Sequence, residues 1–291
     1  MDLIDPPDLE PLIERYFALG AEAIGNPEAH FAFERLRTGL EAGTLRSAEP
    51  DPAAATGWRV NAWVKRGILL GFRLGALEDM SGHHPLGESV LSFVDKATYP
   101  IRRFTPEDGI RIVPGGSSVR SGAHLAKGVV MMPPAYVNAG AFVDEGTMID
   151  SHALVGSSAQ NGKRVHLSAA AQIGGVLEPV SASPVIIEDD ALIGGNTGVY
   201  EGTIVRSRAV LAAGIILTRG TPVYDLPNNT ILKATADAPL IIPSGAVVVA
   251  GSRAIQSGPG KALGLSVYTP IIVKYRDEKT DLSTTLEDLL R

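Results

Sequence analysis

The sequence has no cysteine, few aromatic residues and no long hydrophobic run. Without cysteine among its 291 residues, the chain can form neither a disulfide nor a zinc–thiolate site, and it has no thiol nucleophile. This composition fits a reducing cytoplasm. No apolar stretch approaches the ~20 residues that span a bilayer, and the acidic start MDLIDPPDLEPLIERYF is unlike a signal peptide. We therefore expect a cytoplasmic protein without a membrane partner.

The net charge and the aromatic content further limit the partners and the type of fold that the sequence allows. The net charge of −6 argues against nucleic acid or an anionic membrane as a partner. Aromatic residues make up only 5% of the chain, whereas glycine contributes 32 residues. This balance predicts a repetitive, turn-rich architecture packed by small and aliphatic side chains.

A helical domain is predicted over residues 1–108. Asp5-Pro6-Pro7 and Asn26-Pro27 are typical helix starts, and apolar residues at helical spacing follow each of them. A third helix is predicted over 58–74, WRVNAWVKRGILLGFRL. Its apolar residues cover most of the helix surface, so we expect this helix to be buried.

Beyond residue 108 a period of six residues replaces the helical pattern. Aliphatic residues or methionine occupy 16 of the 17 positions counted in sixes from Val119 to Ile173 and from Ile187 to Val223. Asn161 is the one departure. Six is the period of neither a strand nor a helix. It fits one side of a triangular coil, so three hexads close one turn of a parallel β-helix.

The repeat is interrupted once, between Ile173 and Ile187. These residues are 14 apart, which is one hexad plus eight residues around VLEPVSASP. The insertion predicts a loop extruded at one corner, where solenoids often place binding residues. We assign the β-helix to residues 109–252. A small extension of strands and a helix over 253–291 is expected to cap the last coil.

The hexads resemble those of the left-handed β-helix acyltransferases. Within that group the chain is similar to the tetrahydrodipicolinate N-succinyltransferases of lysine and diaminopimelate biosynthesis. The similar segments are WRVNAWVKRGILLGFR (58–73), GIRIVP (109–114), YVNAGAFVDEGTMID (136–150) and VHLSAAAQIGGVLEP (165–179), and VYEGTIV (199–205) is compatible. The left hand comes from the resemblance alone, because parallel crossovers are ordinarily right-handed.

The resemblance implies a reaction and an assembly. A succinyl group would pass from succinyl-CoA, a co-substrate and not a resident cofactor, to the amine of ring-opened tetrahydrodipicolinate, L-2-amino-6-oxopimelate. The protein would be a homotrimer of small-molecule-binding subunits with active sites between them, and no metal is expected.

Three other interpretations remain open. The same fold and chemistry could use acetyl-CoA or a related amino-acid acceptor in a secondary pathway. Gly198, where many family members have glutamate, and His152, where tryptophan is commoner, favour this alternative. A β-helix carbonic anhydrase would need three histidines converging on a metal at a trimer interface, and His124, His152 and His166 differ in phase along the repeat. The match to the helical domain argues against a non-catalytic scaffold.

Acyl transfer to an amine needs a base for the amine proton, donors for the thioester oxyanion and cations for the carboxylates. The resemblance gives Asp150, in TMIDSHA, contact with the acceptor amine and a part in proton transfer. It gives Arg111, in GIRIVP, a bidentate contact with a substrate carboxylate, and Arg120 is a weaker candidate for that task.

Two histidines are further candidates. His152 lies two residues after Asp150, which is the same face if both belong to one strand. Asp150 would then orient His152 as a base; the alternative is that His152 only lines the cleft. His166 alternates with inward residues and is expected to face out, into the cleft or a subunit contact.

Coenzyme A would be bound by glycines and cations. Gly174 and Gly175 precede the inserted loop, and CoA would approach the backbone closely there, although corners of the coil require glycine anyway. Lys261 and Lys274 are candidates for the CoA phosphates, with Arg276 beside them. Asn196 is a candidate polar replacement for the glutamate missing at Gly198, and Glu201 is another.

Overall fold

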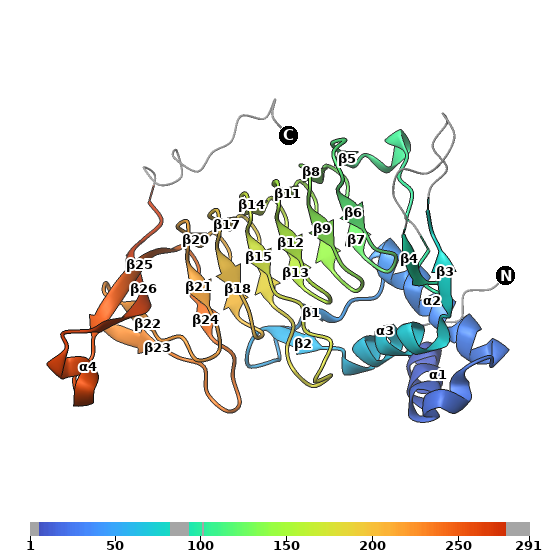
Figure 1. Ribbon diagram of the computed structural model, residues 1–291, viewed down its shortest axis with the longest axis horizontal. Helices are drawn as coiled ribbons and strands as arrows, with labels where there is room; N and C mark the ends of the chain where they lie inside the picture. The colour runs from blue at the N-terminus through green and yellow to red at the C-terminus, as the bar shows by residue number, and fades with distance from the viewer. Residues whose placement is uncertain (1–5, 82–92, 101, 278–291) are drawn as a thin grey trace.

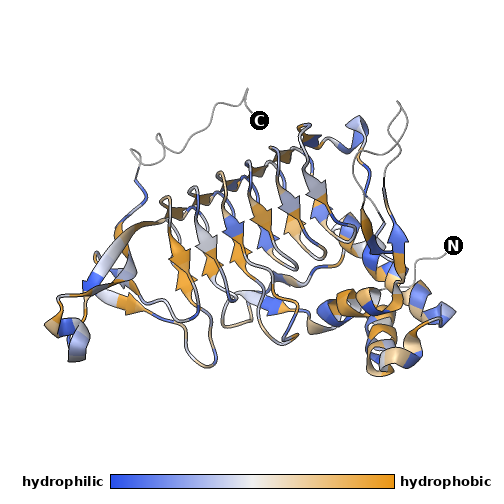
Figure 2. Ribbon diagram, viewed as in Figure 1, coloured by the Kyte–Doolittle hydropathy of each residue, from blue (hydrophilic) through white to orange (hydrophobic). Residues whose placement is uncertain are grey.

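The computed structural model describes residues 6–81, 93–100 and 102–277. A helical domain, a long β-helix and a C-terminal sheet follow one another along the molecule (Figure 1). Hydrophobic residues recur along the strands of the coils and on the helices (Figure 2). Among the described residues, no helix is long and apolar enough to cross a membrane.

The helical domain begins largely where the sequence predicts. Asn26 caps the second helix by accepting the backbone N–H groups of Glu28 and Ala29. The domain's elements are α1 (Pro6–Ala18), η1 (Gly20–Ala23), α2 (Pro27–Ala42), β1 (Ala48–Pro50), β2 (Trp58–Val60), α3 (Ala62–Leu74), β3 (Leu77–Asp79), β4 (Val94–Lys96) and η2 (Pro106–Asp108).

The prediction of a helix from residue 58 is wrong at its start. The third helix begins at Ala62, and Trp58–Val60 forms β2, antiparallel to β1. Trp58 and Val60 pack on Ile186 and Ile204 of the β-helix. Tertiary packing of these side chains decides the local structure here, against their helical spacing. The burial of α3 is confirmed, since Val64, Ile68 and Leu70 are fully buried.

The β-helix consists of two-residue strands stacked in three parallel sheets. The β11 sheet contains β5 (Arg111–Ile112), β8 (Val130–Met131), β11 (Met148–Ile149), β14 (His166–Leu167), β17 (Leu192–Ile193) and β20 (Val210–Leu211). The β12 sheet contains β6 (Ser118–Val119), β9 (Tyr136–Val137), β12 (Leu154–Val155), β15 (Gln172–Ile173), β18 (Gly198–Val199) and β21 (Ile216–Leu217). The β13 sheet contains β7 (His124–Leu125), β10 (Phe142–Val143), β13 (Gln160–Asn161), β16 (Ile186–Ile187), β19 (Ile204–Val205) and β24 (Ile241–Ile242).

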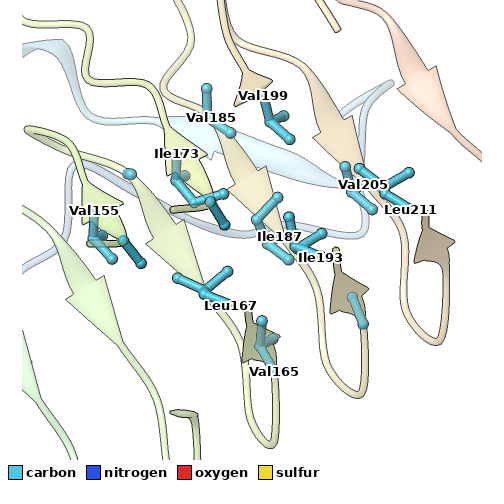
Figure 3. Close-up of a cluster of buried hydrophobic side chains, with 14 of the residues drawn as sticks. Val155, Val165, Leu167, Ile173, Val185, Ile187, Ile193, Val199, Val205 and Leu211 are labelled. Carbon is cyan, nitrogen blue, oxygen red and sulfur yellow. The ribbon is translucent and has the colours of Figure 1, made fainter. Parts of the chain in front are cut away.

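The prediction that residues at the six-residue period fill the interior of a β-helix is confirmed. The second residue of each strand points inward, and Figure 3 shows Val155, Ile173 and Val199 among the side chains that fill the axis. Asn161 also lies inside and is fully buried. Its side-chain oxygen and nitrogen have no hydrogen-bond partner in the described part of the chain.

The eight-residue insertion leaves the coil where the β12 sheet turns into the β13 sheet. β15 ends at Ile173 and β16 starts at Ile186, and both strands keep their places in the stack. Lys65 of α3 holds the loop, donating to the backbone oxygens of Ala182 (2.7 Å) and Pro179 (3.4 Å). The loop is therefore fastened to the helical domain.

The helical domain covers one of the three faces of the β-helix. β2 packs on the outer side of the β13 sheet, where Arg46 Nε donates to Gln160 Oε1 (2.9 Å) and Trp58 Nε1 donates to Glu188 Oε1 (2.9 Å). The backbone oxygen of Glu41 lies 2.9 Å from His124 Nδ1 in the same sheet. The outer faces of the β11 and β12 sheets meet at a corner away from these contacts.

A C-terminal sheet closes the far end of the β11 sheet. It is formed by β25 (Ala246–Ala254), β26 (Ser266–Tyr275), β22 (Val223–Asp225) and β23 (Thr230–Leu232), with α4 (Gly258–Ala262) between β25 and β26. β25 pairs with β20 of the last coil and with β26 on its other side. The domain boundary placed after residue 252 falls inside β25. The helix predicted beyond residue 280 lies outside the described residues.

Candidate functional site

Asp150 lies where the β11 sheet turns into the β12 sheet. This corner, called the Asp150 ridge here, comprises residues 150–153, 168–171, 194–197 and 212–215 in successive coils. The Asp150 N–H donates to the Leu167 oxygen of the next coil (2.9 Å), and its Oδ1 accepts the N–H of Ser151 (2.7 Å). The carboxylate is half-buried. The ridge thus holds an acid at the corner opposite the β13 sheet, on which β2 of the helical domain packs.

The expectation that Asp150 and His152 share a strand face is wrong. His152 has a left-handed backbone (φ 62°) and forms the turn of the corner, outside any strand. Its side chain is exposed, and the Asp150 carboxylate binds the Ser151 N–H in place of the imidazole. The two-residue spacing cannot place both on one face because the chain bends between them. Both residues nevertheless lie on the ridge.

Arg111 and His166 occupy one outward column of the β11 sheet. Arg111 pairs with Val130, Val130 with Met148, and Met148 with His166. With strands about 4.8 Å apart, Arg111 lies about 10 Å from β11 along the axis, and His166 lies one strand beyond β11. Arg111 is exposed and His166 is half-buried. The structure therefore brings both to the face that borders Asp150.

Arg120 is engaged in a contact with the helical domain. Its guanidinium is bonded to Asp95 (2.5 and 2.7 Å) and lies over the rings of Phe72 (4.6 Å) and Tyr99 (5.2 Å). These partners belong to the helical domain and the segment that follows it. Because the charge is already neutralised there, Arg120 serves the packing of that domain on the first coil. A substrate carboxylate would have to displace Asp95.

The three histidines of the repeat do not converge on one point. His124 stacks on Phe142 (4.7 Å) on the β13 sheet beneath the helical domain. His152 lies on the ridge and His166 on the outer face of the β11 sheet. Among the described residues, no three potential ligands gather as a metal site would require. The arrangement gives the carbonic anhydrase interpretation no metal centre within the described chain.

Comparison with known proteins identifies the family. Residues 8–74 match the family described as tetrahydrodipicolinate N-succinyltransferase N-terminal, and residues 184–219 match the hexapeptide repeat of succinyl-transferase. A 2,3,4,5-tetrahydropyridine-2,6-dicarboxylate N-succinyltransferase from Azoarcus sp. is 42% identical over 98% of both chains. One of the same name from Acinetobacter baylyi is 42% identical over 89% of both chains. The chain belongs to the tetrahydrodipicolinate N-succinyltransferase family.

A solved structure supports the fold of this succinyltransferase family member. A Campylobacter jejuni protein described as a 2,3,4,5-tetrahydropyridine-2-carboxylate N-succinyltransferase aligns with a TM-score of 0.54 and 18% identity. The alignment covers 88% of this chain and 64% of that chain. Together with the hexapeptide-repeat match, this likeness confirms the left-handed parallel β-helix.

In this family member, Gly174 and Gly175 have a structural reason to be glycine. Neither has a left-handed φ, so the corner requirement does not apply to them. A Cβ on Gly175 would lie 2.4 Å from Ser157 N of the preceding coil, and one on Gly156 would lie 2.2 Å from Gly175 N. The glycines therefore allow two coils to approach closely beside the inserted loop. A CoA-binding role at Gly174 and Gly175 stays a prediction.

The predicted cations lie toward the C-terminal end of the β-helix. Lys274, on β26, is 3.2 Å from both carboxylate oxygens of Asp277, and Lys261 is exposed in α4. Arg276 donates to the backbone oxygens of Asp190 (3.0 Å) and Arg208 (3.3 Å). Five strand spacings separate β11 from β26, the strand of Lys274, about 24 Å. A phosphate on Lys274 would therefore require an extended ligand along the axis.

Asn196 and Glu201 take different places around Gly198. Asn196 is exposed on the ridge with φ 55°, two coils beyond His152. Glu201 turns away at the next corner, where its Oε2 accepts the N–H of Arg219 (2.8 Å). Glu201 therefore does not stand in for a side chain at Gly198, which lies in strand β18 and not in a turn.

Sequence reasoning missed Tyr200 at this point. A Cβ on Gly198 would lie 2.3 Å from Tyr200 Cε2 and 2.7 Å from Tyr200 Oη. The ring therefore occupies the space that any side chain at residue 198 would need. The signal available in the sequence was the spacing itself: residues 198 and 200 flank the inward Val199, so both face outward.

Proposed function

We propose that the protein is a CoA-dependent N-acyltransferase of lysine and diaminopimelate biosynthesis. It would transfer a succinyl group from succinyl-CoA to the amine of tetrahydrodipicolinate in its open form, L-2-amino-6-oxopimelate. The observation that carries the proposal is the 42% identity over 98% of both chains to an enzyme named for this reaction. That similarity covers the helical domain as well as the repeat, and repeats alone occur in many acyltransferases.

The residues of the Asp150 ridge fit the chemistry. The acceptor nitrogen attacks the thioester carbonyl, a C–N bond forms, the C–S bond breaks, and coenzyme A leaves as the thiol. The attacking amine must lose a proton, and a half-buried carboxylate on the ridge suits that task. We assign the proton transfer to Asp150, and His152 lines the same corner. Arg111, exposed on the adjoining face, would bind an acceptor carboxylate. His166 lies three strands further along the same face and would line the acceptor cleft.

The outer faces of the β11 and β12 sheets beside the ridge support an assembly in which subunits share the site. The helical domain covers the outer side of the β13 sheet, while the β11 and β12 sheets meet at the Asp150 ridge. A neighbouring β-helix packed against either face would convert the ridge into a cleft. We infer a homotrimer with three such clefts, a closed ring in which each subunit uses both faces. Its partners would be small molecules in the cytoplasm, without nucleic acid, membrane or metal.

A second candidate keeps the chemistry and changes a substrate. Gly198 presents no carboxylate on the β12 sheet, and the Tyr200 ring lies in its place. This local difference favours an acetyl-CoA donor or a related amino-acid acceptor as the alternative. A cation placed for the succinyl carboxylate would argue for the first candidate.

The test is the release of coenzyme A with tetrahydrodipicolinate as the acceptor. Succinyl-CoA and acetyl-CoA are compared at equal concentration, with wild type and Asp150→Asn. We expect a preference for succinyl-CoA and a loss of about 10²–10⁴-fold in kcat in the variant. Acetyl-CoA preference, or no turnover of this acceptor, would contradict the proposed reaction.

Asp144→Asn is the matched control for this variant. Asp144 follows β10 as Asp150 follows β11, and its Oδ1 accepts the N–H of Glu145 (2.8 Å) as that of Asp150 accepts the N–H of Ser151. The two aspartates therefore occupy equivalent positions at different corners of one coil. Because the corner of Asp144 joins the β13 and β11 sheets and lies off the ridge, Asp144→Asn should keep full activity. An equal loss in both variants would mean that Asp150 supports the corner and not the reaction.

A further inference from the structure

The Tyr200 ring lies flat on the β12 sheet, where it packs on two glycines. A Cβ on Gly174 would meet Tyr200 Cδ1 at 2.8 Å, and one on Gly198 would meet Cε2, Oη and Cζ at 2.3, 2.7 and 2.8 Å. These glycines belong to neighbouring coils. Any larger residue at either position would push the ring off the sheet, so the pair fixes where the ring lies.

The direction of the ring follows from the same contacts. The Cδ1 edge near the Tyr200 backbone is the part closest to Gly174, and the hydroxyl end lies over Gly198, two residues back along the chain. The ring therefore points from the inserted loop toward residues 194–197 of the Asp150 ridge. The Tyr200 side chain is half-buried, so its hydroxyl is held in place but not enclosed.

Gln172 occupies the coil between that of Tyr200 and that of His152. It pairs with Gly198 in the sheet, so both residues face outward on the β12 sheet. The Gln172 amide nitrogen donates to the backbone oxygens of His152 (3.2 Å) and Ala170 (3.3 Å). With its nitrogen engaged there, the Gln172 amide is oriented along the ridge. His152, Gln172 and Tyr200 thus lie in three successive coils, along the β12 sheet and its border with the Asp150 ridge.

We propose that the Tyr200 hydroxyl is a specificity-determining group that hydrogen-bonds an oxygen of the acceptor bound at the Asp150 ridge. The inference rests on the proposed acyl-transfer function, because it takes the ridge as the place of the acceptor amine. A phenol is neutral and donates one O–H, so it suits a carboxylate or carbonyl oxygen. The acceptor class is an open-chain amino dicarboxylate whose amine faces Asp150 and whose polar end faces Tyr200.

The decisive variant is Tyr200→Phe, which keeps the ring packed on the two glycines and removes only the hydroxyl. Binding of L-2-aminopimelate, a stable amino dicarboxylate, is measured by calorimetry in the presence of coenzyme A. We expect a weakening of about three- to ten-fold, the usual effect of one hydrogen bond. The KM for the acceptor should rise by the same factor, with the KM for the acyl-CoA and the thermal midpoint unchanged.

Two further variants separate recognition from packing. Tyr224→Phe, which makes the same chemical change on β22 in the C-terminal sheet, should behave as wild type. Gly198→Ala adds a methyl group that displaces the ring while keeping the hydroxyl, and should weaken acceptor binding at least as much as Tyr200→Phe. If Tyr200 only fills space, Gly198→Ala will weaken binding and Tyr200→Phe will not, and the proposal is then wrong.

The outcomes also separate this proposal from the proposed function. Wild-type protein that turns over neither acyl-CoA, yet binds L-2-aminopimelate through Tyr200, would contradict the reaction and support the site. Normal turnover with unchanged binding in Tyr200→Phe would support the reaction and overturn the role of Tyr200. Wild-type protein that neither binds L-2-aminopimelate nor turns over tetrahydrodipicolinate would overturn both.

Discussion

Asn161→Leu should stabilise the protein. Asn161 is fully buried among the aliphatic side chains of the β-helix, stacked between Val143 and Ile187 of the β13 sheet. Leucine has the same branching at Cγ, so two methyl groups replace the oxygen and the nitrogen without a large change of shape. The same column already contains Leu125, which shows that leucine fits this part of the coil.

The magnitude follows from the two polar atoms. Neither Oδ1 nor Nδ2 of Asn161 has a hydrogen-bond partner among the described residues, and each such buried group costs about 1–3 kcal/mol. Because leucine removes both costs, we expect an increase of about 2–4 kcal/mol in the free energy of unfolding. For a chain of this size that corresponds to a rise of about 4–12 °C in Tm. Activity should not change, since the side chain points into the axis.

The measurement is thermal and urea unfolding at fixed protein concentration, with Thr147→Val as the matched control. Thr147 is equally buried in the coil, but its hydroxyl donates to the Gly162 oxygen (2.8 Å) and accepts the Val165 N–H (3.0 Å). Valine has the same shape and breaks both bonds, so this control should lose about 1–3 kcal/mol. A lower Tm for Asn161→Leu would refute the reasoning, because it would mean that the amide is satisfied inside the coil.

Two further predictions concern pH. Burial lowers the pKa of Lys65 to about 8, whereas an unfolded lysine titrates near 10.4. The charged form therefore costs stability below pH 8, and this cost disappears as the pH rises from 8 to 10.4. In urea unfolding, the free energy of unfolding of wild type should rise by up to ~3 kcal/mol relative to that of Lys65→Met over that window. A difference between the two that stays constant with pH would contradict this prediction. In the C-terminal sheet, burial acts to raise the pKa of Asp225, but hydrogen bonds from Tyr275 (2.6 Å) and Asn228 (2.8 Å) hold that pKa below its usual value. The stability from this carboxylate is present above about pH 3.9 and is lost as the pH falls through its folded pKa. Tyr275→Phe should therefore cost about 1.5–3 kcal/mol at pH 7 and move the acid-unfolding midpoint to higher pH, as followed by circular dichroism; an unchanged midpoint would contradict it.

The fold was predictable because its signal is local and repeated. One period of six residues places the inward side chains of every coil, and the same count gives the corner that contains Asp150 and its successors. The start of α3 was not predictable from spacing, because Trp58 and Val60 become a strand through contact with Ile186 and Ile204, more than 120 residues away. A pattern within one segment does not contain such a contact.

The site was predictable only in part, for a related reason. The family resemblance predicts Asp150 and Arg111, and the fold places Arg111 on the β11 sheet and Asp150 at its border with the β12 sheet. The prediction that Asp150 and His152 share one face is wrong because the chain turns at His152 with φ 62°, and a two-residue spacing gives one face only within a strand. Tyr200 was missed because its meaning depends on Gly174 in the neighbouring coil. The repeat pattern makes Gly174 and Tyr200 neighbours only when the eight inserted residues between them are left out of the count.

The outer face of the β12 sheet links these features to one another. Along one edge runs the Asp150 ridge, and along the other lies the inserted loop, one side of the coil away. Lys65 ties that loop to α3 through the Ala182 oxygen, and Leu177 of the loop packs on the core of the helical domain. The helical domain thus covers the β13 sheet and also fixes the far edge of the β12 sheet. Between the two edges, Tyr200 points from the loop side toward the ridge. A substrate across this face, as proposed, would therefore lie between the ridge and the loop that the helical domain fastens.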